Sequence, residues 1–332
     1  MKLAPKLPMT AFACVLTLCI VAGTSALASA APPQAARHTS TTSSISYTFT
    51  TYNDSNDPSF NQLLGINDQQ VIAGYFGSGS TSSPNKGYTL IPPYAQTDYR
   101  NENFPKSVQT QVTGLNDSTT TVGFYINSAG SNIGFVHTPS GFTSVSDPST
   151  PAAPSVNQLL GVNNNGIAVG FYDNSAGNSV PYEYDIATKT FTTLSLPKSA
   201  VSAFASGIND QNDVVGTLTL SNGDTQGWEI VNGTFDTLHI SKQLDTDMVS
   251  ATGVNDLLQV VGSFVTSSGN TEGFVDNDGT AQVITDSDAN GFTVVNGINN
   301  GGTLVGFYDT VAGDNCTNTC DGFAAVPAPY AP

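Results

Sequence analysis

Acidic side chains, with one tyrosine and one arginine, are the residues of this sequence best placed for chemistry. Two carboxylates that face each other about 5 to 9.5 Å apart can cleave a glycosidic bond, because one protonates the leaving group while the other attacks or activates water. Much of the scarce charge lies in connections of variable sequence, where proteins commonly bind ligands; acidic loops also serve simply to keep a protein soluble. The candidates for one ligand-binding face are Tyr99, Arg100, Asp147, Asp245, Asp247, Asp286 and Asp288, and Asp54, Asp57 and Asp98 lie in the same kind of segment.

Motifs for other chemistries do not occur in the sequence. There is no G-x-S-x-G elbow, and neither His137 nor His239 lies in a context that indicates a serine-histidine-acid triad. The glycines punctuate hairpins rather than open helices, so no phosphate loop or dinucleotide fingerprint is present. The Asp-x-Asp pairs lack the spacing and the closing Glu of a calcium loop. We therefore expect no cofactor, with a divalent cation such as calcium as the alternative.

The N-terminus has the features of an export signal. Lys2 and Lys6 precede an apolar run that is too short for a good membrane span, and "ALASA" offers small residues for cleavage after Ala30. We predict a signal peptide over residues 1–30, a flexible linker over 31–44 and a secreted or periplasmic mature protein without a membrane span.

The four cysteines divide into two pairs. Cys14 and Cys19 lie within the predicted signal peptide, whereas Cys316 and Cys320 have the spacing C-x-x-x-C near the other end of the chain. An exported chain meets oxidising conditions, so we predict a disulfide between Cys316 and Cys320. A metal pair is the alternative, but it lacks further ligands.

The chain is acidic and yet poor in charge. Its net charge is −17, its pI is about 4.1 and only 11% of its residues are charged. Nucleic acid is disfavoured as a partner because its phosphates would be repelled. Because so few residues are charged, Ser, Thr, Asn and Gly must form most of the surface.

The segments between the candidate loops repeat. "GINDQQVIAG" and five relatives of it begin at Gly65, Gly114, Gly161, Gly207, Gly253 and Gly297. These starts are 44 to 49 residues apart, which is about the length of one propeller blade. A second glycine follows nine residues after each first one, without insertion, so each motif is a tight hairpin.

Each copy is predicted to contain four strands. The first ends at the "GIN"-type triplet, the Asx pair after it turns the chain, and the third begins with an aromatic residue such as Tyr88 or Trp228. The second strand is apolar at successive positions, for example Val260 and Val261, so both of its faces must be buried. Sheets stacked face to face around an axis meet this requirement, and that arrangement is a β-propeller.

The two ends of the chain predict a closed ring. The sixth copy stops after its third strand, and an unpaired strand, Ile45–Asp54, precedes the first copy. We expect this strand to complete the sixth blade and remove the open edge. The prediction is a single all-β domain over residues 45–327, a six-bladed propeller of four-stranded antiparallel blades, with a tail over 328–332 and a monomeric state. The fourth strand of the first copy is poorly defined, and Tyr99 and Arg100 are placed in the connection that follows it.

Two sets of recurring residues have a structural and a functional interpretation. The Asx pairs from Asn67-Asp68 to Asn299-Asn300 should ring the central channel, either as turn formers or as an oxygen ring that attracts calcium. The aromatic residues of the second and third strands either fill the space between blades or stack on sugars. Regular recurrence favours the structural interpretation in both cases.

The repeat resembles the bacterial extracellular HAF repeat family, whose core reads G-[IV]-N-[DN]-x-G-x-V-V-G followed by a glycine-aromatic pair. The resemblance covers Gly65 to about Phe323, although the His-Ala-Phe tripeptide that names the family is replaced by "GFV", "GYT", "GWE" or "GFA". Membership implies an exported repeat protein, and the family carries no agreed catalytic residue to this chain.

Three functions are compatible with the sequence. The first is an exported, non-catalytic propeller that binds a carbohydrate or a cell-surface partner through the variable loops opposite the Asx turns. The second is a polysaccharide-cleaving enzyme, a glycoside hydrolase or lyase, which would use acidic residues of the same face. The third is a structural envelope protein without a ligand.

Overall fold

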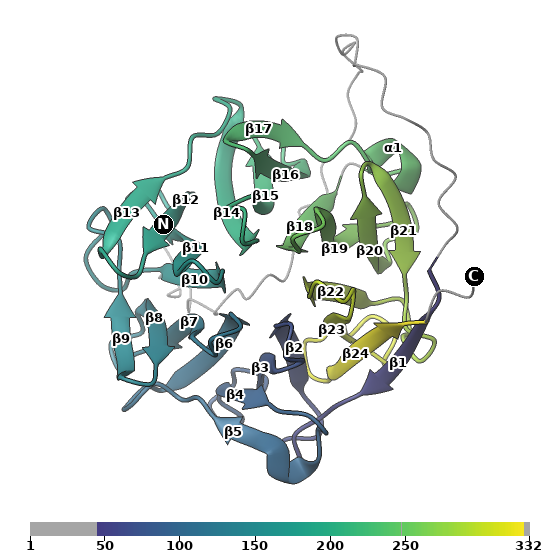
Figure 1. Ribbon diagram of the computed structural model, residues 1–332, viewed down its shortest axis with the longest axis horizontal. Helices are drawn as coiled ribbons and strands as arrows, with labels where there is room; N and C mark the ends of the chain where they lie inside the picture. Colours follow the sequence, from purple (N-terminus) through teal and green to yellow (C-terminus); the bar gives the residue numbers. More distant parts are fainter. Residues whose placement is uncertain (1–44, 247, 329–332) are drawn as a thin grey trace, which may run out of the picture.

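The protein folds as a six-bladed β-propeller. The structure, a computed structural model, describes residues 45–246 and 248–328. These residues form six four-stranded antiparallel sheets around one axis (Figure 1). In each blade the first strand lies nearest the axis, and the fourth lies at the rim. The predicted fold class is therefore confirmed.

The blades follow the order of the repeats. Blade 1 contains β2 (Asn61–Ile66), β3 (Ile72–Phe76), β4 (Lys86–Leu90) and β5 (Tyr99–Asn101). Blade 2 contains β6 (Gln109–Leu115), β7 (Thr121–Ile126), β8 (Asn132–Thr138) and β9 (Gly141–Val145). Blade 3 contains β10 (Asn157–Val162), β11 (Ile167–Asp173), β12 (Ser179–Asp185) and β13 (Thr190–Thr193).

The second half of the ring has the same plan. Blade 4 contains β14 (Ala200–Ile208), β15 (Val214–Leu220), β16 (Thr225–Val231) and β17 (Thr234–Thr237). Blade 5 contains β18 (Val249–Val254), β19 (Gln259–Val265), β20 (Thr271–Asn277) and β21 (Thr280–Ile284). Blade 6 contains β22 (Thr293–Ile298), β23 (Leu304–Tyr308), β24 (Asp321–Pro327) and β1 (Tyr47–Thr51). Within the described residues, two short helices, η1 (Gln96–Asp98) and α1 (Ser241–Leu244), lie between strands.

The ring is closed where the start of the described chain meets its end. Strand β1 pairs antiparallel with β24, with Thr51 opposite Phe323 (Figure 1). The Phe49 ring packs 5.2 Å from the Phe323 ring. Ahead of β1, the Ile45 N–H donates to Gln282 Oε1 (2.8 Å) and Gln282 Nε2 donates to the Ile45 carbonyl oxygen (2.6 Å). The predicted closure is thus confirmed.

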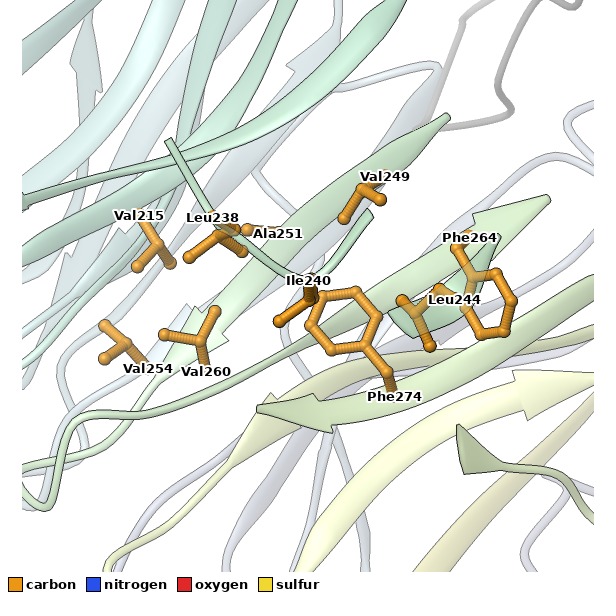
Figure 2. Packing of buried hydrophobic residues seen from close by; sticks show 10 residues of the cluster. All are labelled: Val215, Leu238, Ile240, Leu244, Val249, Ala251, Val254, Val260, Phe264 and Phe274. Carbon is orange, nitrogen blue, oxygen red and sulfur yellow. The ribbon is translucent and has the colours of Figure 1, made fainter. Parts of the chain in front are cut away.

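Recurring aromatic side chains form the core of each blade. Tyr88, Phe135, Tyr182, Trp228, Phe274 and Phe323 are all buried. The sequence predicted this packing role for them, and it is confirmed because buried rings are not available to stack on sugars. Between blades 4 and 5 the crossover adds Leu238, Ile240 and Leu244, which pack beside Val249 and Phe274 (Figure 2).

One assignment made from the sequence is wrong. Tyr99 and Arg100 lie in β5, the fourth strand of blade 1, and not in the connection that follows it. The strand has only three residues, so it lacks the alternating pattern that marks the other outer strands. The Tyr99 ring lies 4.9 Å from the Tyr88 ring, so Tyr99 contributes to the packing of blade 1.

The second glycine of each motif permits close packing of the sheet, which predicts a specific cost for a methyl group. A Cβ on Gly262 would collide with the carbonyl oxygen of Ser250 and lie 2.9 Å from the Phe274 ring. We expect Gly262→Ala to lower the free energy of unfolding by about 2–3 kcal/mol, as measured by urea denaturation. Gly301→Ala, in an exposed turn where the nearest atom is 3.3 Å away, is the control. Equal costs for the two variants would contradict this account of the glycine.

Candidate functional site

The propeller has two faces of different character. The turn face carries the six tight turns between the first and second strands, from Asn67-Asp68 to Asn299-Asn300. The loop face carries the connections between second and third strands and the crossovers from one blade to the next. The repeated motifs therefore meet on the turn face, and the variable sequences gather on the loop face.

On the turn face, the first Asx residue of every turn links its blade to the next. The Asn67 side-chain amide donates to the carbonyl oxygen of Asn116 (3.0 Å). The same bond recurs around the ring, and the last one runs from Asn299 back to the carbonyl oxygen of Asn67 (3.0 Å). The intermediate donors are Asn116, Asn163, Asn209 and Asn255. Six side chains thus form one closed circle of hydrogen bonds.

The second Asx residue of each turn is more exposed than the first, and these residues form a second closed circle, the outer circle. The Asp68 N–H donates to Asp117 Oδ1 (2.9 Å), and the series ends where the Asn300 N–H donates to Asp68 Oδ1 (2.8 Å). The intermediate pairs involve Asp117, Asn164, Asp210 and Asp256. Four carboxylates and two carboxamides therefore surround the mouth of the channel.

The two carboxamides lie opposite each other and bridge carboxylates. Asn164 Nδ2 donates to Asp117 Oδ2 and Asp210 Oδ2, both at 2.8 Å. Asn300 Nδ2 donates to Asp68 Oδ2 (2.8 Å) and Asp256 Oδ2 (2.7 Å). The neighbouring carboxylates Asp68–Asp117 and Asp210–Asp256 have no such bridge between them. The prediction that these turns ring the channel is confirmed. Their role as turn formers is shown within each turn, where the side-chain oxygen of the first Asx residue accepts from the N–H four residues later, as Asn67 Oδ1 does from Val71 (2.8 Å).

The channel contains two adjoining cavities of about 80 Å³ each. The outer cavity lies within the Asx circles, and the inner one lies deeper along the first strands. Six apolar residues line both cavities and lie between the Asx circles of the outer cavity and the strand residues deeper in the inner cavity. They are Ile66, Leu115, Val162, Ile208, Val254 and Ile298. Within residues 45–246 and 248–328, no group of three or more His, Cys, Asp or Glu residues could hold one metal ion.

On the loop face, the buried aspartates among the candidates hold the crossovers in shape. The Asp147 N–H donates to Asn157 Oδ1 (2.9 Å), and Asp147 Oδ1 accepts from the Ser149 N–H (2.7 Å). Asp54 makes the same pair of bonds in the crossover to blade 1. Asp286 accepts from the Asp288 N–H (2.9 Å) in the crossover to blade 6. Each carboxylate satisfies backbone donors of its own loop.

The remaining candidates are separated in space. Asp245 is exposed at the C-terminus of α1, Asp288 is exposed before blade 6, and Arg100 lies in the rim strand of blade 1. Asp247 lies outside the described residues. The structure therefore places Asp286 next to Asp288 and distributes the other candidates over different blades.

The connections between second and third strands on the loop face have fixed shapes. Asn127 Oδ1 accepts from the N–H groups of Ala129 (2.9 Å) and Ser131 (3.1 Å). Asn174 forms the equivalent pair in blade 3, and Thr266 Oγ1 accepts from the Asn270 N–H in blade 5 (3.1 Å). These caps leave small polar side chains exposed on a preorganised backbone.

The longest of these connections, in blade 6, carries the disulfide. Cys316 and Cys320 are bonded, as predicted. The buried Asp309 accepts from the Cys316 N–H (2.8 Å). Burial raises the pKa of Asp314, but hydrogen bonds from Thr319 and Asn318 outweigh this effect and lower that pKa to about 2.

One pair of titratable side chains was not found from the sequence. His137 Nδ1 lies 2.6 Å from Glu102 Oε2, and the Phe142 ring stacks on the imidazole at 3.9 Å. Glu102 follows the rim strand of blade 1, and His137 belongs to blade 2. Sequence offered no signal for this contact because the two residues are far apart in the chain and lie in different blades.

Comparisons with known proteins bear on the fold. No family model and no curated protein sequence matches the chain. Its structure is similar to TolB from Acinetobacter baumannii, with 12% identity, 78% of this chain covered and a TM-score of 0.52. The match covers 63% of TolB, which is less than two thirds of that protein. It is also similar to a gluconolactonase from Xanthomonas campestris, with 8% identity, 85% and 90% of the two chains covered and a TM-score of 0.50. At these identities the likeness shows the fold alone.

No helix in the described part of the chain is long and apolar enough to cross a lipid bilayer.

The buried Asp286 generates a pH-dependent prediction. Burial raises its pKa, a hydrogen bond from the Asp288 N–H opposes the rise, and the charges of Asp288 and Asp321 add to it. A folded-state pKa above the unfolded value means that stability is full below the unfolded pKa and falls as pH rises through the folded pKa. Asp286→Asn keeps an oxygen acceptor and removes the charge. We expect it to raise the melting temperature by about 2 °C at pH 7–8 and to leave it unchanged near pH 3.

Thermal denaturation from pH 3 to pH 8 measures this difference. Asp245→Asn changes the same charge at an exposed position and serves as the control. A gain for Asp286→Asn that does not increase with pH would contradict the role assigned to its burial.

Proposed function

We propose that this protein is an exported, non-catalytic, monomeric propeller that binds a polysaccharide or a carbohydrate-bearing cell surface through its loop face. The proposal includes a signal peptide over residues 1–30 and a secreted or periplasmic location, as in the HAF repeat family that the sequence resembles. The disulfide between Cys316 and Cys320 supports export, because such bonds persist in oxidising compartments.

The observation that carries the proposal is the chemistry of the exposed loops. The exposed residues of the second-to-third-strand connections in blades 2, 3 and 5 are small or neutral and polar, such as Ser128, Ser175, Asn178 and Ser267. Hydroxyl and carboxamide groups donate and accept hydrogen bonds without a charge. A ligand rich in hydroxyl groups and without charge of its own matches such a surface.

The fixed shape of these loops supports binding as well. Ordering a loop on association costs free energy, and a preformed loop avoids much of that cost. The side-chain caps of Asn127, Asn174 and Thr266 hold the loops in one shape in the free protein. A weak, polar ligand such as a polysaccharide can therefore be bound at several such loops together.

The burial and the hydrogen bonding of the loop-face carboxylates favour binding over cleavage. Asp54, Asp147 and Asp286 are buried, and each accepts backbone N–H donors within its own crossover. A carboxylate that cleaves a glycosidic bond must contact the sugar. The exposed Asp245 and Asp288 lie in different crossovers, which does not favour a facing pair.

Binding to a panel of immobilised polysaccharides tests the proposal. Ser128→Glu with Ser175→Glu places charge and bulk on the loop face, and we expect at least about a tenfold loss of affinity. Ser140→Glu with Ala187→Glu makes the same change in charge at exposed turns between third and fourth strands, on the turn face, and should bind normally.

Two outcomes would contradict the proposal. One is an equal loss of binding in both double variants. The other is the release of reducing ends or unsaturated products from a polysaccharide that is abolished by Asp245→Asn or Asp286→Asn, since this result would establish the catalytic alternative.

A further inference from the structure

The start of the third strand links a blade to the next one on the loop face. Between blades 2 and 3 the Asn132 N–H donates to the Ser155 carbonyl oxygen (2.8 Å), and between blades 5 and 6 the Thr271 N–H donates to the Gly291 carbonyl oxygen (3.0 Å). The connection that leads to the third strand is short in these blades, as residues 266–270 show in blade 5. Hydrogen bonds within each connection hold it in one shape.

In blade 6 the residue at this position is Cys320. The Cys320 N–H donates to the Ser59 carbonyl oxygen (2.9 Å), and the Asn61 N–H donates to the Cys320 carbonyl oxygen (2.7 Å). The connection that ends here spans residues 309–320 and is much longer than its counterparts. A long connection has more open conformations than a short one, so fixing it costs more entropy. The disulfide to Cys316 removes part of this freedom.

The disulfide is packed into the contact between the last blade and the first. Cys316 and Cys320 are only 9% and 1% exposed. They share an apolar cluster with Phe307 of blade 6 and with Phe60, which lies in the crossover to blade 1. Gln62 Nε2, in the first strand of blade 1, donates to Cys320 Sγ (3.6 Å). The bond therefore restrains a segment that three parts of the chain contact.

The residues that follow the disulfide hold the end of β1. Asp321 Oδ1 accepts from Asn53 Nδ2, and the Gly322 N–H donates to Asn53 Oδ1 (3.1 Å). The Tyr52 N–H donates to the Gly322 carbonyl oxygen (2.8 Å). Strand β1 closes the ring, and the crossover from β1 to β2 begins at these contacts (Figure 1). The disulfide thus adjoins the contacts on which closure depends.

We propose that the disulfide is a redox-dependent lock on the closure of the ring. In the oxidised protein the bond holds the connection of blade 6, which in turn holds the closure seam, residues 47–61. In the reduced protein the connection gains conformational freedom, so the closure seam opens more often while the other blades stay paired. Since the protein is proposed to be exported, closure then depends on arrival in an oxidising compartment, and this last step alone rests on the proposed export.

The redox step is thiol–disulfide exchange. A dithiol reductant such as dithiothreitol attacks the bond and becomes a cyclic disulfide, while two electrons and two protons pass to Cys316 Sγ and Cys320 Sγ, which become thiols. A disulfide oxidant such as oxidised glutathione reverses the step and is itself reduced to thiols. Because both sulfur atoms are buried in the folded protein, reduction is carried out on the unfolded chain, which is then refolded with the reductant.

Hydrogen exchange followed by mass spectrometry tests the lock on the whole mature protein. We expect the amides of the closure seam to exchange about tenfold or more faster in the reduced than in the oxidised protein. Blade 3, residues 157–193, lies across the ring from blade 6 and should exchange at the same rate in both forms. Oxidised glutathione should restore slow exchange in the closure seam.

Matched variants separate the bond from other changes in the loops. Cys316→Ser with Cys320→Ser should exchange as the reduced protein does, and it should not respond to the reductant. Asn127→Ala removes the cap of the corresponding connection in blade 2 and is the control. It should speed exchange near that connection and leave the closure seam unchanged. If the reduced protein or a variant does not fold, sucrose, which favours the folded state, is added to every sample.

Three outcomes would overturn the proposal. The first is equal exchange of the closure seam in the oxidised and reduced proteins. The second is an equal rise in every blade, because the bond would then be a general stabiliser. The third is faster exchange of the closure seam in Asn127→Ala to the same extent as in the reduced protein. Polysaccharide binding plays no part in this measurement, so the lock and the loop-face site succeed or fail separately.

Discussion

The close approach of six blades at one axis is the constraint on which the rest of this structure depends. A Cβ on Gly65 would lie 3.1 Å from the Cα of Gly114, and the same contact recurs around the ring until Gly297 meets Gly65. Only at such short range can the side chain of Asn67 reach the carbonyl oxygen of the next turn. The first glycine, the asparagine and the spacing to the second glycine are therefore parts of one requirement, and this is why they recur in every copy.

The shortage of cations explains how the acidic residues are held. Of the nine Lys and Arg residues, Lys2, Lys6 and Arg37 precede residue 45, which leaves six for the described chain. Two ion pairs in the described chain join His137 to Glu102 and His239 to Asp236. Carboxylates such as Asp147 instead accept backbone N–H groups of their own loops. Charge-assisted hydrogen bonds of this kind fix loop shape and leave the net negative charge uncompensated.

The sequence predicted the features that recur in every blade, together with the single disulfide, and it missed features of individual loops and of one short strand. The circle of turns, the buried aromatic residues and the pairing of β1 with β24 follow from patterns that occur in six copies or from the one copy that lacks a strand. The three-residue strand β5 was missed because a short outer strand imposes little pattern. The burial of Asp147 and Asp286 was also not visible, since an aspartate that caps a loop and one that binds a ligand occur in the same polar segments.

The hydrogen-bond circle at the channel mouth does not require the negative charge that the mouth carries. The outer circle needs an Oδ1 acceptor from each turn, and Asn164 and Asn300 provide it as well as the aspartates do. Alternating Asp and Asn would have allowed every carboxylate to be bridged on both sides. The observed order instead leaves Asp68 beside Asp117 and Asp210 beside Asp256, and like charges at neighbouring positions repel. The four negative charges at the mouth therefore repel one another, and the hydrogen bonds that these carboxylates accept from the Asn164 and Asn300 amides and from backbone N–H groups offset part of that repulsion.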